Sequence, residues 1–244
     1  MGGVSMNRLS KHQFAEYRRI ANSRSVRVEK KRCIISGQKI IADLPPHINK
    51  LHYLYTNQPM DISVESTEIS INQMQSITGL KEPDGHTLII EIPQPVDKLD
   101  TTKHWVYLHR IQNPGNIGAI VRCAHAFSWG VISSHDSCDL FHTKSIRGSA
   151  GSVFHIPYQY CDLSDLSKIS EPFECLTTGL AGSHIHAWNG DDRSKILIFC
   201  NEGAGWQYPF KVDMLTVPLN PTCDSLNVAV AAGIIMHHIS EVDG

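Results

Sequence analysis

The second half of the chain contains strand candidates that are apolar at nearly every position, not only at every second one. The runs ILIF at 196–199 and LTVPL at 215–219 are the clearest examples. A strand of this kind is buried on both faces, as in parallel sheets that helices cover on both sides. The pattern therefore predicts an α/β fold with a mainly parallel sheet from His104 onward. In such sheets ligands bind at the carboxyl ends of the strands.

Strand and helix candidates alternate along residues 104–244. We expect strands at 105–111, 131–134, 154–160, 174–179, 195–200 and 214–219. We expect helices at 117–127, 139–146, 163–169 and 225–239, with Asp224 or Ser225 as the N-cap of the last one. This alternation is typical of strands that are joined by crossover helices.

Residues 1–95 show shorter elements and are predicted to form a small α/β domain of their own. Helical spacing predicts helices at 9–20, with Ser10 as N-cap, at 38–43 and at 69–77. Strand candidates lie at 51–55 and 87–92, and an apolar pair lies at 34–35. The polar, proline-punctuated stretch PQPVDKLDTTK at 93–103 then marks a domain boundary. We take residues 96–103 as the linker and 104–244 as the second domain.

Composition excludes several classes of protein. Seven cysteines without a C-x-x-C pair do not suit a disulfide framework or a structural zinc site, and they favour a reducing compartment. The fourteen histidines are dispersed, and the adjacent His237 and His238 would diverge by about 100° on a helix. No segment approaches the roughly 20 apolar residues that a membrane span needs. We expect a cytoplasmic protein without a metal.

Positive charge is concentrated near the amino terminus, although the net charge of the chain is only −2. Residues 7–32 hold nine basic and two acidic side chains, or +7, which leaves about −9 for the remainder. Such a segment favours a polyanion partner such as RNA. The candidate contacts are Arg18, Arg19, Arg24, Arg27, Lys30, Lys31 and Arg32. Two alternative interpretations of this basic segment are a solvated helix face and an Arg- and Ser-rich transit peptide. Targeting to an organelle therefore stays open.

Three turns that follow strands carry unusual residues. The first is Asn-Pro-Gly-Asn at 113–116, where Asn116 precedes Arg122 by six residues. The second, at 200–205, places Glu202 among glycines, and the third runs from Val217 to Asn227. Each turn alone is weak: glycine after a strand often only makes a corner, and Arg122 could be an ordinary ion-pair partner. No dinucleotide fingerprint, Walker loop or nucleophile elbow is present.

Together the turns resemble the SpoU/TrmH branch of the SPOUT methyltransferases. The matching motifs are N-P-x-N-x-G-x-x-x-R-x-A, N-E-G-x-G and V-P-L…S-L-N-V-A-V-A, with KSIRGSAGSVFHIPY between the first and the second. The resemblance spans 104–239. More loosely, LSK…KKRCIISGQKIIADL resembles the small substrate-binding domain that often precedes the catalytic domain in this family.

The resemblance implies a C-terminal trefoil knot, a homodimer, and S-adenosylmethionine as the methyl donor. It implies methylation of a ribose 2′-hydroxyl in structured RNA, with ribosomal RNA favoured over transfer RNA. The implied catalytic cluster is Asn116, Arg122, Glu202, Ser225 and Asn227. The implied cofactor cleft is Thr178, Gly179, Cys200, Gly203, Val217 and Leu226.

Arg122 is the family's proposed activator, but a guanidinium stays protonated. We therefore expect it to stabilise the developing alkoxide or to clamp a phosphate. No metal is required, because the leaving group is a neutral thioether. Cys200 stands where the family usually has glycine, which leaves a non-catalytic RNA-binding or ribosome-assembly factor as the alternative function. Methylation of a base is a third possibility.

Overall fold

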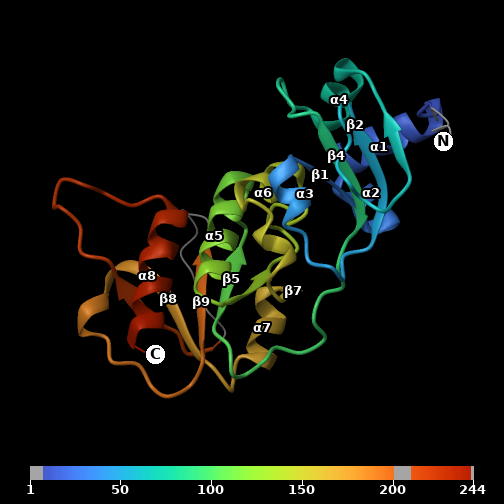
Figure 1. The fold of residues 1–244 in the computed structure, drawn as a ribbon. Helices are drawn as coiled ribbons and strands as arrows, with labels where there is room; N and C mark the ends of the chain where they lie inside the picture. The colour runs from blue at the N-terminus through green and yellow to red at the C-terminus, as the bar shows by residue number, and fades with distance from the viewer. Residues whose placement is uncertain (1–7, 201–209, 243–244) are drawn as a thin grey trace. The chain divides into compact units, whose positions relative to one another are not determined.

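A computed structural model describes residues 8–200 and 210–242 of the 244-residue chain (Figure 1). The chain divides into two compact units. The first comprises Met1–Gln94 together with Phe141–Phe154, and the second comprises Pro95–Leu140 together with His155–Gly244. Each unit is described by itself. Of the expected site residues, Glu202 and Gly203 lie outside the described residues.

The first unit is built on a four-stranded sheet with the order β1-β4-β2-β3. Its strands are β1 (Arg32–Ser36), β2 (Lys50–Tyr55), β3 (Ser66–Glu68) and β4 (His86–Glu91). Its helices are α1 (Lys11–Asn22), α2 (Arg24–Lys30), α3 (Gln38–Ala42), α4 (Ile71–Thr78) and α6 (Thr143–Gly148), with a 3-10 turn at Ser152–Phe154. The central strand β4 is antiparallel to both β1 and β2, while β3 is parallel to β2.

Local sequence signals account for the two longer helices of this unit. Ser10 caps α1 in a capping box with Gln13, as the sequence predicts, and Ser70 caps α4 in the same way. The inward faces of these helices share one apolar cluster with the sheet, in which Ile20, Met74 and Leu54 are fully buried. Burial of such side chains stabilises each by about 1.5–3 kcal/mol.

Helix α2 is an element that hydrophobic periodicity did not predict, and it changes the interpretation of Arg27. The Arg27 side chain is 2% exposed, and its guanidinium donates to the carbonyl oxygens of Ile20 (2.7 Å) and Ala21 (3.0 Å) at the end of α1. A cation that is buried in this way cannot reach an RNA phosphate. The expectation that Arg27 contacts RNA is therefore wrong, because the folded unit uses its charge to join α1 to α2.

We expect Arg27→Ala to lower the free energy of unfolding by about 2–4 kcal/mol, because charged hydrogen bonds are lost and carbonyl groups remain unsatisfied. Arg19→Ala, at an exposed position of α1, should change it by no more than about 0.5 kcal/mol. Urea unfolding followed by circular dichroism measures both. Equal, small effects for the two variants would contradict a structural role for Arg27.

A chain of buried polar groups crosses the same unit. The Tyr17 hydroxyl lies 2.7 Å from Nδ1 of His52, and Nε2 of His52 lies 2.9 Å from Oγ1 of Thr67. Burial lowers the pKa of His52 and raises that of Tyr17 to about 12. Neutral His52 and un-ionised Tyr17 are therefore the forms that the folded unit favours.

The lowered pKa of His52 predicts that the first unit is sensitive to acid. A histidine with a folded pKa below its unfolded value near 6.5 contributes stability above that value and loses it as the pH falls. Thermal unfolding between pH 7.5 and 5 should show this loss, and His52→Gln should flatten the profile because glutamine does not titrate. An unchanged pH slope in His52→Gln would show that another group is responsible.

The second unit contains a six-stranded sheet with the order β10-β8-β9-β5-β6-β7, in which every neighbouring pair is parallel. Its strands are β5 (Trp105–His109), β6 (Gly130–Ser133), β7 (Tyr158–Tyr160), β8 (Glu174–His184), β9 (Lys195–Cys200) and β10 (Asp213–Thr216). Its helices are α5 (Pro114–Ala126), α7 (Leu163–Ile169) and α8 (Val228–Val242), with a 3-10 turn at Ile185–Ala187. The predicted parallel α/β sheet is confirmed.

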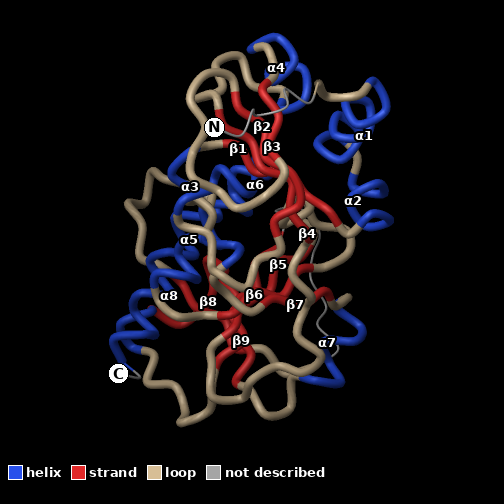
Figure 2. Tube along the Cα trace, turned by 45° about the vertical axis from the view of Figure 1, so that its right-hand side comes forward, coloured by secondary structure: helices blue, strands red, loops and turns tan. Residues whose placement is uncertain are grey.

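Helices cover this sheet on both faces, as continuous apolar strands require. Trp105 and Tyr107 of β5 pack in one cluster with Leu166 of α7. Their neighbours Val106 and Leu108 point to the other face and are also fully buried. Helices α5 and α8 lie side by side in both views, and Nε1 of Trp129 donates to Oγ of Ser240 at 3.0 Å (Figures 1 and 2).

Several predicted boundaries are wrong. Residues 152–154 form a 3-10 turn, so β7 begins only at Tyr158, and β8 continues beyond Gly179 to His184. Strand β10 ends at Thr216 and shifts its register against β8 between Met214 and Leu215. Helix α6 covers only the end of the expected segment and belongs to the first unit, because Phe141–Phe154 packs there.

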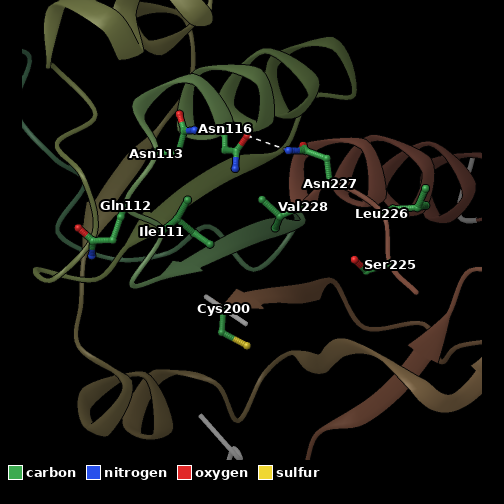
Figure 3. Close-up of a pocket in the computed structure, with 9 residues that line it drawn as sticks. All are labelled: Ile111, Gln112, Asn113, Asn116, Cys200, Ser225, Leu226, Asn227 and Val228. Atoms are coloured by element: carbon green, nitrogen blue, oxygen red, sulfur yellow. Dashed lines mark hydrogen bonds between the residues drawn. The ribbon is translucent and has the colours of Figure 1, made fainter. Parts of the chain in front are cut away.

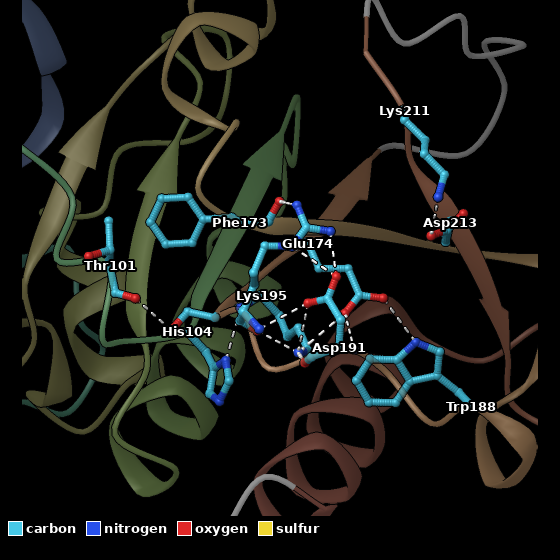
Figure 4. A network of polar contacts seen from close by, with 11 residues as sticks. Thr101, His104, Phe173, Glu174, Trp188, Asp191, Lys195, Lys211 and Asp213 are labelled. Carbon is cyan, nitrogen blue, oxygen red and sulfur yellow. Dashed lines mark hydrogen bonds and ion pairs between the residues drawn. The ribbon is translucent and has the colours of Figure 1, made fainter.

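A buried ionic network fixes the amino ends of β8 and β9 (Figure 4). The Lys195 side chain is fully buried, and its Nζ lies 3.2 Å from Oε2 of Glu174 while donating to the carbonyl oxygens of Asp191 and Arg193. Nε1 of Trp188 donates to the other Glu174 oxygen at 3.3 Å. A buried charge that is paired and hydrogen-bonded in this way fixes one geometry, and it holds β9 in place at its start.

Within residues 8–200 and 210–242, no helix is both long and apolar enough to cross a membrane. The same residues contain no group of three or more His, Cys, Asp or Glu side chains arranged to hold a metal ion. The cysteines that the structure describes form no disulfide.

Candidate functional site

A pocket of about 380 Å³ opens where β5 and β9 end and α5 and α8 begin (Figure 3). It is lined by Ile111, Gln112, Asn113, Asn116, Cys200, Ser225, Leu226, Asn227 and Val228. Strands β5 and β9 are parallel neighbours, with His109 opposite Cys200, so their carboxyl ends lie at one edge of the sheet. This is the edge where the sequence predicted a ligand site.

The wall after β5 is held by hydrogen bonds to the turn after β6. The backbone N–H of Arg110 donates to Oγ of Ser134 and that of Ile111 to Oγ of Ser137, both at 3.1 Å. Arg110 has φ 53°, a left-handed conformation that costs a non-glycine residue free energy. Nε2 of Gln112 donates to the carbonyl oxygen of Asp136 at 2.7 Å. These bonds keep the strained turn, and with it this pocket wall, in one conformation.

The wall from α5 begins at Asn113, whose Oδ1 accepts from the backbone N–H of Gly115 at 2.8 Å. Pro114 occupies the first helical turn, where a backbone N–H would have no hydrogen-bond partner within the helix, so its absence in proline costs nothing. Asn116 follows one turn further along, half-buried and directed at the pocket.

The wall from α8 begins at Asn227. Its Oδ1 accepts from the backbone N–H of Ala229 at 2.9 Å, and its Nδ2 donates to Oδ1 of Asn116 at 3.2 Å. The expected N-cap, Asp224 or Ser225, is therefore wrong. The helix starts at Val228, and the Asn227 side chain accepts from the N–H of Ala229, the second residue of the helix.

Five of the expected site residues come together in this pocket although they lie far apart in the sequence. They are Asn116, Cys200, Ser225, Leu226 and Asn227. Their positions agree with the sequence-based expectation, while their roles remain predictions. Sequence reasoning did not assign Ile111, Gln112, Asn113 or Val228 to the site, although an Asn-Pro pair after a strand already indicated a helix start there.

Arg122 is exposed on α5 and does not line the pocket. Six residues along a helix correspond to about 600° of rotation and about 9 Å of rise, so Arg122 leaves α5 on a different side from Asn116. Within one protomer, the described pocket therefore lacks the cation that the resemblance implies.

The remaining expected cofactor residues lie on β8 and after β10. Thr178, Gly179 and Val217 are half-buried and do not line the pocket. A Cβ on Gly179 would come within 2.6 Å of Sδ of Met214, but this atom belongs to a flexible, exposed side chain that can move aside. Packing against β10 therefore does not by itself require glycine at this position.

The described lining is neutral. It consists of amides, a hydroxyl, a thiol and aliphatic side chains, and it contains no carboxylate, imidazole or amine. Such a surface can orient a ligand through hydrogen bonds and apolar contact, but it supplies no strong base. Any charge that takes part in a reaction must come from other parts of the protein or from the ligands.

Residues 103–237 match the model of the SpoU rRNA Methylase family. Over 192 residues the chain is 30% identical to the 23S rRNA (guanosine(2553)-2'-O)-methyltransferase RlmP of Bacillus subtilis, covering 75% of this chain and 77% of that protein. It is also 30% identical to an uncharacterized tRNA/rRNA methyltransferase of Synechocystis, covering 72% of this chain and 67% of the relative.

Solved structures show the same fold. The AdoMet-bound rRNA methyltransferase from Sinorhizobium meliloti has a TM-score of 0.83 at 22% identity and covers 96% of both chains. The SpoU methyltransferase AviRb from Streptomyces viridochromogenes, in complex with AdoMet, has a TM-score of 0.79 at 20% identity, covering 94% of this chain and 97% of that one. The chain belongs to the SpoU rRNA methylase family.

Proposed function

We propose that this protein transfers a methyl group from S-adenosylmethionine to a ribose 2′-hydroxyl in structured ribosomal RNA. The observation that carries the proposal is the pocket itself. Three separate segments bring Asn116, Cys200 and the Ser225–Asn227 stretch to one sheet edge, and these are residues that the family resemblance assigns to the site. Family membership and the 2′-O-methyltransferase relatives support the same reaction.

The pocket is compatible with S-adenosylmethionine. Its volume of about 380 Å³ lies within the range of about 300–1,000 Å³ for small-molecule sites. Ile111, Leu226 and Val228 provide apolar surface for a base, and neighbouring amides and the Ser225 hydroxyl can bond to polar groups. Gly203, Thr178, Gly179 and Val217 are proposed to complete the cleft. The cofactor supplies an electrophilic methyl group when it is bound.

The protein's own contribution is positional and electrostatic. The side-chain amides of Asn116 and Asn227, at the amino-terminal ends of α5 and α8, hold the target ribose. Its hydroxyl oxygen is then aligned for in-line attack on the methyl carbon. Arg122 stabilises the negative charge that develops on this oxygen, and Glu202 orients Arg122. The neutral lining is consistent with this division of roles, because none of the described residues that line the pocket carries a competing charge.

A homodimer would bring Arg122 to a pocket. Helix α8 exposes Val230 (51%) and Ile234 (40%) one helical turn apart, next to the small residues Ala231 and Gly233. This narrow apolar surface on α8 fits a second copy of the same chain, since a two-fold axis places identical surfaces together. In this arrangement the Arg122 side chain enters the partner's pocket. The C-terminal trefoil knot is likewise proposed from the family.

The first unit is proposed to bind RNA through its exposed cations. Arg18, Arg19, Lys30 and Lys31 are exposed, whereas Arg24 is half-buried and Arg32 pairs with Glu16 at 3.1 Å. Phosphate contacts made by the exposed group would be sensitive to salt, because binding releases counterions.

We expect the double variant Lys30→Ala, Lys31→Ala to weaken RNA binding for all sequences. The slope of log K against log salt concentration should fall by about one for each phosphate contact that is lost. Lys168→Ala, an exposed site on α7 in the second unit, serves as the control. Filter binding over a salt series measures both variants, and equal slopes would contradict the assignment.

Transfer of a tritiated methyl group to ribosomal RNA, followed by nucleoside analysis, tests the proposed function. Label in a 2′-O-methylnucleoside is the expected result, whereas label in a base would assign the protein to base methylation. Calorimetry with S-adenosylmethionine distinguishes the remaining alternative. RNA binding without cofactor binding or transfer would identify a non-catalytic assembly factor.

A further inference from the structure

The hydrogen bond between Asn116 and Asn227 fixes the direction in which both amides face. A backbone N–H can only donate, so the atom of Asn227 that lies 2.9 Å from the Ala229 nitrogen is its carbonyl oxygen Oδ1. The other end of this side chain, Nδ2, must therefore be the donor that lies 3.2 Å from Asn116. A donor requires an acceptor, which identifies the Asn116 atom as Oδ1.

We call the hydrogen bonds from Ala229 to Asn227 and from Asn227 to Asn116 the relay. Among the residues that the structure describes, it leaves the Asn116 nitrogen available to a ligand. Its carbonyl oxygen is occupied by Asn227, and its Nδ2 is directed toward Ile111 and Val228 on the pocket side (Figure 3). Asn116 thus directs its N–H donors at the pocket, while its carbonyl oxygen is directed at Asn227. The α8 amino terminus beside it adds a partial positive charge, which also favours an acceptor.

We propose that Asn116 donates a hydrogen bond to an oxygen of the target nucleotide, and that Asn227 is a positioning residue that sets this polarity. The oxygen is either the ribose oxygen that attacks or a phosphate oxygen next to it. This inference rests on the proposed function and defines the role of Asn116. It does not assign the hydroxyl proton to Asn116, because a neutral amide is not a base and its carbonyl oxygen faces Asn227.

Substitution of Asn116 tests whether its side chain donates a hydrogen bond to the substrate or accepts one from it. Asn116→Asp keeps oxygen atoms that can accept from Asn227, but it has no N–H for the substrate. We expect its kcat/KM for RNA to fall to at least the same extent as in Asn116→Ala, by about 10²–10³, which is typical of removing one preorganised donor. A retained or increased kcat/KM in Asn116→Asp would overturn the proposal, because it would show that an oxygen is the useful atom.

Two substitutions of Asn227 remove the relay while keeping the helix cap. Aspartate and serine can both accept from the Ala229 N–H. Ionised aspartate has no hydrogen to donate to Asn116, and the serine hydroxyl, although it is a donor, sits one bond closer to the backbone than Nδ2 of Asn227, which already lies 3.2 Å from Asn116. We expect Asn227→Asp and Asn227→Ser to keep the melting temperature and to lose turnover about tenfold or more. If Asn227 were only a cap, both variants would stay active, and that result would overturn the relay.

Asn113→Asp is the matched control for added charge. Asn113 lines the same pocket and caps α5, but its side-chain bond to Gly115 stays within its own helix. We therefore expect a smaller loss in Asn113→Asp than in Asn227→Asp. Equal losses in these two variants, with full activity in Asn227→Ser, would show that charge and not the relay is responsible.

The kinetic pattern identifies the oxygen that Asn116 contacts. A lower kcat with unchanged RNA affinity assigns the attacking ribose oxygen, whereas weaker RNA binding with unchanged kcat assigns a phosphate oxygen. The side-chain NH₂ resonances of Asn116, identified by their absence in Asn116→Asp, give a readout that is independent of activity. They should shift in Asn227→Ser, and unchanged resonances would overturn the relay even if the wild-type protein transferred no methyl group and the proposed function failed.

Discussion

Arg122→Ala is expected to lose nearly all methyl transfer while still binding S-adenosylmethionine. The described lining of the pocket is neutral, so a cation that stabilises the developing alkoxide must be supplied from elsewhere, and exposed Arg122 is the family's candidate. Removal of one such electrostatic contact costs about 10²–10³ in kcat. Single-turnover transfer of a labelled methyl group measures the loss, and calorimetry measures cofactor binding.

The control for Arg122→Ala is Lys168→Ala, which removes a cation from an exposed position on α7. This variant should transfer methyl groups as the wild-type protein does. Arg122→Lys should recover only part of the activity, because lysine keeps the charge but not the planar, bidentate donor geometry. Substantial turnover by a folded, dimeric Arg122→Ala protein would contradict the role that we give to this residue.

The double variant Val230→Asp, Ile234→Asp is expected to be monomeric and inactive. Both side chains are exposed on one side of α8, and a two-fold axis would place four added carboxylates close together. We expect association to weaken by about 100-fold or more, as for a lost interface hot spot. Analytical ultracentrifugation measures the dimer, and turnover should fall with the dimer fraction.

Val28→Asp is the control for the dimer variant, because Val28 is an exposed valine (66%) on α2 in the first unit. It should remain dimeric.

Mixing the Arg122→Ala protein with the Asn116→Ala protein supplies a second test. Mixed dimers contain one complete site only if Arg122 acts in the partner's pocket, so activity should return on mixing. A fully active monomer, or no recovery in mixed dimers, would contradict a shared site.

Strong local patterns were sufficient to predict much of the second unit. The expected bounds of the strand at 195–200 and the helix at 163–169 agree with β9 and α7 residue for residue. A continuous apolar run identifies a strand that is buried on both faces, and the strand-end rule then places the pocket. The prediction of Ser10 as the N-cap of the first helix is confirmed, although α1 begins at Lys11 and ends at Asn22, two residues after each predicted bound.

The wrong predictions concern features that depend on distant parts of the chain. Arg27 carries the same charge as its exposed neighbours, and only the packing of α2 against the end of α1 buries it. Asp224, Ser225 and Asn227 can all cap a helix, so local preference does not choose among them. The Phe141–Phe154 segment comes from the middle of the second unit's sequence but packs in the first.

At the site, too, the features that were not predicted depend on distant parts of the chain. The family resemblance pointed to Asn116 and Asn227, but it gave no information about the direction of the hydrogen bond between them. That direction follows from a third group, the Ala229 N–H, whose position depends on where α8 starts. Similarly, Arg122 belongs to the same motif as Asn116, yet helical rotation takes it out of the protomer's pocket.

The most direct test of the central claim is to incubate the purified protein with ribosomal RNA and tritiated S-adenosylmethionine, and then to identify the labelled nucleoside. RNA from cells that lack the protein is the appropriate substrate, because its target ribose is unmethylated. We predict label at one position, in a 2′-O-methylnucleoside, and little label with Arg122→Ala. Label in a base, or binding of RNA and cofactor without any transfer, would contradict the claim.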